Sequence, residues 1–219
     1  MRRTPFVLLA TLALASLAAP AAARANTAPG SGWSFTLSAW AGASRYDVLG
    51  LEHGVANVGA ADGKTLLDGS FDVKGGAGVL RLGWLELGLL YEGTLLDTRA
   101  DSEVFTPVAG FKVDLTDVIR LEVLGELGGH RLGHIGTGLE GVTDTQTVWL
   151  PYVGVRPSVA FRLPVSALRL VLSVTPFARW DLVKRQVEVQ TSTGGTTSRT
   201  YYEAGGSTFG VVGAVGIEI

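Results

Sequence analysis

The sequence predicts an all-β fold, an eight-stranded antiparallel up-and-down transmembrane β-barrel, from three observations. First, apolar and polar residues alternate in segment after segment, so that Leu85, Leu87 and Leu89 are separated by Glu86 and Gly88. Successive side chains of a strand point to opposite faces of the sheet. Second, the mean hydropathy is +0.31, although the chain after its N-terminal region lacks the ~18 uninterrupted apolar residues of a membrane helix. Third, tight turns alternate with long loops, as in membrane barrels.

The N-terminal region has the composition of a secretory signal peptide. Two arginines precede an apolar stretch at residues 6–19, and an Ala-x-Ala site ends at Ala25. We therefore predict a signal peptide over residues 1–25 and a single barrel domain over residues 26–219. Cleavage would leave 15 basic against 20 acidic residues, and this net charge of −5 excludes a broadly basic surface for nucleic acid.

The first three strands are predicted from the alternation and from the connections between them. The first lies near residues 33–45 and is followed by a long loop over residues 46–69. The second and third, near residues 70–82 and 84–96, are separated by the tight connection at Gly83-Trp84. Two such runs joined by a short turn predict a β-hairpin.

The next four strands form two further hairpins. Their predicted ranges are 104–115 and 118–130, which meet at the tight turn 116–117, and 147–163 and 168–183, which meet at residues 164–167. The longer connections are rich in Gly, Thr, Ser and Asp and cover residues 97–103, 131–146 and 184–199. Short turns at one end and long loops at the other are typical of bacterial outer-membrane barrels.

The eighth strand is predicted over residues 200–219. Its apolar register continues through Val211, Val215 and Ile217 to Ile219. The preceding segment also alternates between Gln186 and Gln190, and Gly194-Gly195 is a hairpin signal. We therefore expect strands seven and eight to extend beyond the membrane as a two-stranded ribbon.

Alternation alone also fits a soluble β-sandwich or a soluble barrel, so the direction of each face needs other observations. If the apolar face meets lipid, the opposite register fills the lumen with nearly equal numbers of acids and bases, and most of the bases are arginine. Such balance is required where charges are packed together away from water. This predicted lumen ion-pair network comprises Asp72, Lys74, Glu86, Glu92, Lys112, Asp114, Arg120, Glu122, Glu126, Arg156, Arg162, Arg169, Arg179, Asp181 and Glu218.

Aromatic residues of the apolar register fall near the ends of the predicted strands. Two aromatic bands that bound an aliphatic middle are typical of a membrane barrel. The predicted girdle comprises Tyr91, Phe105, Trp149, Trp180 and Phe209 toward the loops and Trp33, Phe35 and Phe161 toward the turns. Exceptions to the pattern are Trp40, Leu90, Leu124 and Phe177 in the polar register and Pro107, Pro151, Pro157 and Pro176 in the apolar one. We expect some of these prolines to mark bulges or strand ends.

With its alternating ending at residues 208–219, the chain resembles the small eight-stranded bacterial outer-membrane barrels. This group includes the OmpA transmembrane domain, OmpX and OmpW. The resemblance implies a porin-like monomer in the outer membrane of a Gram-negative bacterium, in contact with outer-membrane lipid and lipopolysaccharide. It also implies periplasmic chaperones and the barrel-assembly machinery as partners during biogenesis. Such proteins usually end in Phe or Trp, and Ile219 departs from this pattern.

The sequence predicts no catalytic site, no cofactor and no metal site. His130 lies in the polar register with Glu126, and His134 follows in the next loop. A histidine with a carboxylate can bind a metal or move protons, but we interpret His130 as part of an ion-pair network. A lipid A deacylase would have a serine close to the histidine on one strand, and the positions after His130 hold none.

Two further patterns are interpreted as solvated loops. The string Gly136-x-Gly138-x-x-Gly141 matches a dinucleotide fingerprint, but it neither follows a βαβ-type strand nor opens a helix. The acidic residues Asp97, Asp101 and Glu103 lie in a predicted short loop. The long loop over residues 46–69 is unusually apolar and could cover the barrel mouth or contact a partner.

The leading functional hypothesis is an integral outer-membrane protein with a structural, surface-interaction or lipid-interface role. An eight-stranded barrel has an interior just filled by side chains, which argues against a wide pore. One alternative is a narrow transporter for small or hydrophobic molecules with a side exit, for which the prolines of strands six and seven are the support. The others are a lipid-modifying enzyme and a soluble periplasmic ligand-binding barrel.

Overall fold

A computed structural model describes residues 32–51, 69–96, 100–135, 146–193 and 196–219. The predicted signal peptide therefore lies outside the described residues. The strands within them are β1 (Trp33–Leu51), β2 (Gly69–Leu82), β3 (Leu85–Leu96), β4 (Ala100–Asp114), β5 (Ile119–Ile135), β6 (Gln146–Val165), β7 (Leu168–Asp181), β8 (Arg185–Thr193) and β9 (Thr196–Glu218).

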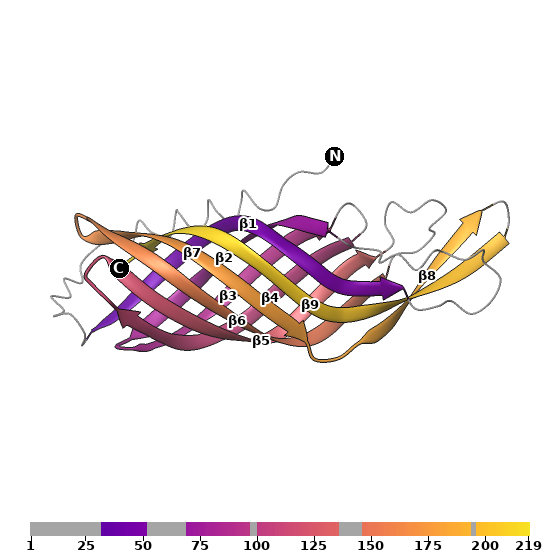
Figure 1. Cartoon of the computed structure of the whole chain (residues 1–219), viewed down its shortest axis with the longest axis horizontal. Helices are drawn as coiled ribbons and strands as arrows, with labels where there is room; N and C mark the ends of the chain where they lie inside the picture. The colour runs from indigo at the N-terminus through magenta and orange to yellow at the C-terminus, as the bar shows by residue number, and fades with distance from the viewer. Residues whose placement is uncertain (1–31, 52–68, 97–99, 136–145, 194–195) are drawn as a thin grey trace.

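Eight of these strands close into a barrel. Each strand from β1 to β6 pairs antiparallel with the next strand along the chain, β7 pairs with β9, and β9 returns to pair with β1 (Figure 1). The closure leaves no open sheet edge in the wall. The prediction of an all-β, eight-stranded antiparallel barrel is confirmed. No helix in the described part of the chain is long and apolar enough to cross a membrane.

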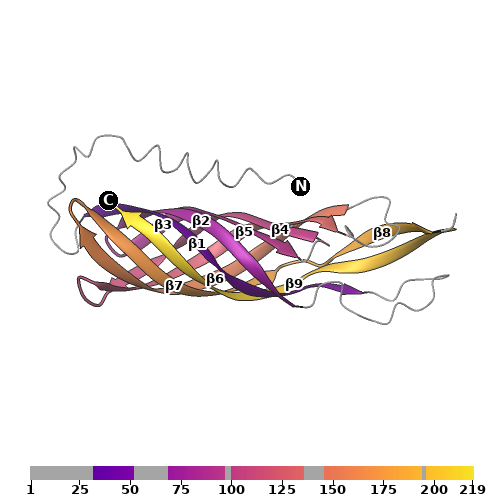
Figure 2. The ribbon, with the colours of Figure 1, turned by 90° about the horizontal axis from the view of Figure 1, so that it is seen from above.

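A two-stranded ribbon continues from one end of the barrel. The C-terminal part of β9 pairs with β7, whereas its N-terminal part pairs with β8, from Thr193↔Thr196 to Arg185↔Ala204. Figures 1 and 2 show this ribbon projecting beyond the barrel wall in both views. The predicted ribbon is confirmed, and its predicted turn at Gly194-Gly195 lies outside the described residues.

Several strands reach further toward the loops than predicted. β1 continues to Leu51 because its end pairs with β9, as in Leu49↔Ala204. β4 begins at Ala100 because Asp101 pairs with Gly133 of β5. Asp101, Glu103 and His134 therefore lie in strands, and our placement of them in loops is wrong. Asp97, the string from Gly136 to Gly141 and residues 52–68 lie outside the described residues.

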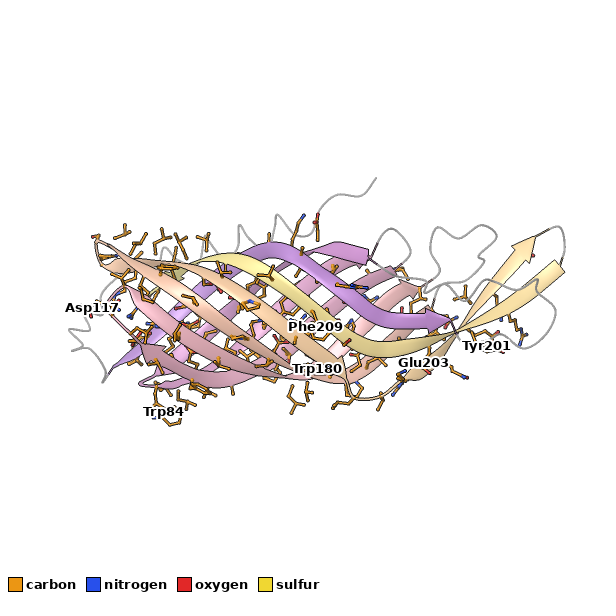
Figure 3. All side chains as sticks on the ribbon, viewed as in Figure 1. Trp84, Asp117, Trp180, Tyr201, Glu203 and Phe209 are labelled. Carbon is orange, nitrogen blue, oxygen red and sulfur yellow. The ribbon has the colours of Figure 1, made fainter. Side chains whose placement is uncertain are left out.

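The outer face of the barrel is apolar between two levels of aromatic side chains. The structure places all the predicted girdle residues on this face, with Phe105 60% exposed, Trp149 55% exposed and Tyr91 half-buried. Trp180 and Phe209 meet edge to face with their ring centroids 6.0 Å apart. Trp84 and Phe111, which the prediction missed, are exposed near the turns. Figure 3 shows Trp84 far from the ribbon, at the opposite end of the molecule from Tyr201 and Glu203.

Three of the four prolines interrupt the hydrogen-bond ladder of the wall without shifting its register. Pro157 and Pro176 lie between the pairs Val155↔Ala178 and Val159↔Val174 of β6 and β7. At Pro107, the β4–β5 ladder is interrupted in the same way. Since the register is the same on both sides of each gap, the expected bulges and strand ends are absent at these three prolines. Proline has no N–H to donate, which explains the gaps.

The gap beside Pro107 coincides with a pocket in the wall. Its volume is about 500 Å³, and its lining includes Leu87, Leu127 and Pro107 together with the lumen residue Glu126. The lining therefore includes both outward-facing residues and a residue of the interior.

Candidate functional site: the filled lumen

The lumen begins near the turns with Arg81, which the predicted network did not include. The two-residue turn pairs Leu82 with Leu85, so Leu82 shares the outer face of Leu85 and its neighbour Arg81 points inward, opposite Glu86. Cross-strand partners lie on the same side of a sheet.

Asp72 and Lys74, predicted for the lumen, consequently lie on the outer face. Both are exposed, in the same register as Leu80 and Leu82. The predicted phase of this strand was shifted by one residue, and in a strand a shift of one residue exchanges the two faces.

A cluster of five buried charges, the turn-side cluster, fills the lumen near the turns. The Arg81 guanidinium contacts Glu86 at 2.5 Å and Glu122 at 2.8 Å. The Arg120 guanidinium contacts Glu218 at 2.6 Å and Glu122 at 3.3 Å. Because each buried charge has partners of the opposite sign from other strands, the cluster joins β2, β3, β5 and β9 across the interior.

The remaining predicted lumen residues of this end lie at its rim. Asp114 accepts hydrogen bonds from Lys112 at 2.7 Å and Arg120 at 2.9 Å, and it lies 2.9 Å from the Arg162 guanidinium. Arg169 is about half exposed and lies 3.3 Å from Glu218. These contacts connect the turn-side cluster to the solvent at the turn end.

A second group of charges, the loop-side cluster, contains Glu92, Glu126, Arg156 and Arg179. The Arg156 guanidinium lies 2.7 Å from Glu92 and 2.8 Å from Glu126. Arg179 also pairs with both carboxylates, at 2.5 Å from Glu126. Two acids and two bases therefore neutralise one another inside the barrel, each base contacting each acid.

Aromatic rings enclose the two arginines of the loop-side cluster. The Arg156 guanidinium lies 4.9 Å from the ring centroids of both Trp40 and Phe177, and that of Arg179 lies 4.7 Å from Phe177 and 5.7 Å from Tyr152. Cation–π contacts of this kind are stronger where water is excluded. The large apolar residues that fall in the polar register, Trp40 and Phe177 among them, thus pack inside the lumen.

An apolar cluster lies between the two groups of charges and around the loop-side cluster. Along β5, the inward residues run in the order Arg120, Glu122, Leu124, Glu126 and His130, from the turns to the loops. The buried members of the apolar cluster are Trp40, Val73, Ala77, Val79, Leu90, Val104, Val108, Leu124, Tyr152, Phe177 and Val212. Charged and apolar side chains therefore fill the barrel together.

His130 and Asp181 lie on the loop side of the loop-side cluster, together with a serine that the sequence analysis missed. His130 Nε2 lies 2.8 Å from the Ser102 hydroxyl, and its Nδ1 lies 3.0 Å from a carboxylate oxygen of Asp181. We looked for a serine on the strand of His130, but Ser102 comes from neighbouring β4, where Val104 pairs with His130. The predicted pairing of these two strands was the only indication of this contact in the sequence. It brings together two residues that are 28 positions apart.

The other predicted histidine and the acidic residues form a separate group at the outer rim. His134 Nδ1 lies 2.7 Å from Asp101, and Arg131 contacts Asp101 at 3.1 Å and Glu103 at 2.8 Å. Glu126, which we considered as a partner for His130, instead binds two arginines and accepts a hydrogen bond from Tyr152. In the described ranges, groups of three or more His, Asp or Glu side chains arranged to hold a metal ion are absent.

Comparison with known proteins identifies the fold but no family. No family model matches the chain, and no curated protein matches it. Among solved structures, Neisserial surface protein A (NspA) is similar with a TM-score of 0.53 at 11% identity, over 86% of this chain and 98% of that one. The outer membrane protein AlkL in lipid bilayers matches with a TM-score of 0.36 at 11% identity, over 91% of this chain and 95% of that one. By its fold, the chain is a closed eight-stranded barrel like that of NspA.

Proposed function

We propose that this chain is an integral outer-membrane protein with a closed, non-conducting barrel and a structural or lipid-interface role. The observation that carries the proposal is that apolar side chains cover the outside of the barrel and charged side chains fill its inside. Large apolar side chains such as Leu89 and Leu127 are exposed, by 53% and 64%, while Arg120 and Glu92 are buried. A soluble barrel requires the opposite arrangement, whereas lipid favours this one. In this proposal, an N-terminal signal peptide directs export.

The partners that we propose are outer-membrane lipid and lipopolysaccharide. Lys74 and Arg45 are exposed on the outer face, and Arg131 lies on the same face beside Trp149. Cations at the level of the loop-side aromatic band would meet the anionic groups of lipid head groups.

Membrane extraction and gel mobility test the proposed location. After cell fractionation, the chain should stay in the membrane pellet through a carbonate wash, and it should migrate differently in detergent gels before and after boiling. Recovery of the chain in the soluble fraction would contradict the proposal.

Planar-bilayer recording tests the proposed closed lumen. The wild-type chain should show no sustained conductance, because two clusters of charges and an apolar cluster fill the interior. The double variant Trp40→Ala/Phe177→Ala removes the rings on either side of Arg156 and should introduce measurable openings. Equal conductance of the two proteins would contradict the idea that these side chains close the barrel.

A narrow transporter with a side exit is the second candidate function, favoured by the interrupted wall. The pocket beside Pro107 and the gap at Pro157 and Pro176 are the places where the ladder is weakest. Uptake of a small apolar fluorophore into proteoliposomes should then exceed that of empty liposomes and fall when Pro157 and Pro176 are both replaced by valine. Uptake no faster than in empty liposomes would exclude this candidate.

A further inference from the structure

Three polar side chains at the loop end of the lumen form a hydrogen-bonded chain that the proposed function does not use. Ser102 of β4, His130 of β5 and Asp181 of β7 converge from separate strands, with 2.8 Å between Ser102 Oγ and His130 Nε2 and 3.0 Å between His130 Nδ1 and Asp181 Oδ1. All three are buried: Ser102 is 2% exposed, His130 is 4% exposed and the Asp181 side chain is 3% exposed.

The contacts assign a role to each nitrogen of the imidazole. An ionised carboxylate only accepts hydrogen bonds, so Nδ1 of His130 carries the hydrogen and donates it to Asp181. In the neutral imidazole, the lone pair of Nε2 then accepts a hydrogen bond from the Ser102 hydroxyl. The second oxygen of Asp181 accepts the backbone N–H of Gly206 at 3.2 Å, which fixes the carboxylate. This is the arrangement in which an imidazole removes a proton from a serine hydroxyl.

The surroundings of the serine indicate the class of substrate. Leu132 lies opposite Ser102 in the β4–β5 ladder, Leu150 lies opposite His130 in the β5–β6 ladder, and both leucines are fully buried. Toward the turns, the loop-side cluster and the apolar cluster fill the lumen. The aliphatic side chains beside the hydroxyl therefore favour a substrate with an apolar group.

We infer that Ser102, His130 and Asp181 form a hydrolytic site for carboxylic esters with an apolar acyl group. Ser102 Oγ bonds to the ester carbonyl carbon while its proton passes to His130 Nε2. The bond from that carbon to the alcohol oxygen then breaks, and the alcohol leaves with the proton from His130. Water repeats the sequence on the acyl-serine and releases the carboxylic acid, so that one ester and one water give one acid and one alcohol. Asp181 is a positioning residue that holds the ring.

A covalent serine probe tests this site in the folded, full-length chain. The protein is purified in detergent micelles, its folding is verified by gel mobility before boiling, and it is treated with an alkyl fluorophosphonate. Peptide mass spectrometry should find the label on Ser102, and Ser102→Ala should remove it. His130→Asn should slow labelling by roughly 10²-fold or more, as expected for loss of a general base.

Two further variants separate a hydrolytic site from a structural hydrogen-bond chain. Ser158→Ala is the matched control, because Ser158 is another lumen serine that contacts Glu122 at 3.2 Å and not His130; it should label at the wild-type rate. Asp181→Asn should change the pH dependence of the labelling rate, and Asp181→Glu should restore part of that rate. Hydrolysis of a p-nitrophenyl ester should be faster for a twelve-carbon than for a two-carbon acyl group.

The inference is overturned by any of three results. These are a folded wild-type chain that takes no label on Ser102, a label that maps to another residue, and His130→Asn labelling at the wild-type rate. Mapping on the wild-type protein alone decides the question if a variant fails to fold. Because the assay is done in detergent, its outcome is independent of the proposed membrane location.

Discussion

The Glu126 carboxylate lies between two buried guanidinium groups and a tyrosine hydroxyl. Its oxygens are 2.8 Å from Arg156 and 2.5 Å from Arg179, and Tyr152 donates a hydrogen bond to it at 3.1 Å. The favourable terms are the short contacts within a medium of low dielectric constant, and the cost is the removal of four charges from water. The charges are tolerable because they are equal in number.

Glu126→Gln should therefore be strongly destabilising. It leaves two guanidinium groups against one carboxylate, and breaking a buried pair costs about 3–5 kcal/mol. The free energy of unfolding in lipid vesicles, from urea titration, measures the loss. The double variant Glu126→Gln/Arg179→Met restores the balance and should lose less than Glu126→Gln alone, while Glu103→Gln at the half-exposed rim should change stability by under about 1 kcal/mol. A double variant less stable than the single one would contradict the importance of charge balance.

At the level of the strand, β9 shows how glycines shape the lumen. A Cβ on Gly210 would lie 2.5 Å from two ring atoms of Phe177, which is itself held between Arg156 and Arg179. A Cβ on Gly213, three residues along the same strand, would meet nothing within 4 Å. The two glycines therefore have different reasons for being small, and only the first is required by packing.

Gly210→Val should lower the free energy of unfolding by about 1–3 kcal/mol, the usual cost of overpacking a filled interior. Gly213→Val should leave stability unchanged or raise it slightly, since valine favours strands and the position is open. Urea unfolding of the two variants in the same vesicles gives the comparison. Similar losses in both would show that the effect comes from strand backbone and not from contact with Phe177.

Prediction from the sequence succeeded in locating the strands but failed for the phase of one of them. Alternation located every barrel strand, because burial on one face of a sheet has a period of two. It misplaced Asp72 and Lys74 and left out Arg81, because the phase of β2 is set by the turn at Gly83, where φ is +63°, and not by its own glycine-rich residues. The contact of Ser102 with His130 was unpredictable from spacing, since it depends on which residues of two neighbouring strands face each other.

For the whole molecule, the outward apolar face makes a direct energetic prediction. Leu87 lies between the two aromatic levels and is 43% exposed. If this surface meets the bilayer midplane, Leu87→Arg should cost about 2–4 kcal/mol, whereas Val165→Arg, near the turns, should cost about 0–1 kcal/mol. Unfolding measured in vesicles tests the difference. Equal costs at the two positions would contradict the assigned depth.

The barrel closes where its first strand, β1, pairs with its last strand, β9, so it cannot close until β9 has been synthesised. The backbone N–H and C=O of Ile219 bond reciprocally with Phe35, and Glu218 lies beside Thr36, 182 positions away in sequence. Contacts so distant form late, after long loops have been ordered. A chain truncated before β9 would form a sheet whose edge strands are unpaired, and such edges readily associate with other chains. Truncated chains of this kind would thus be open sheets that proteases can attack.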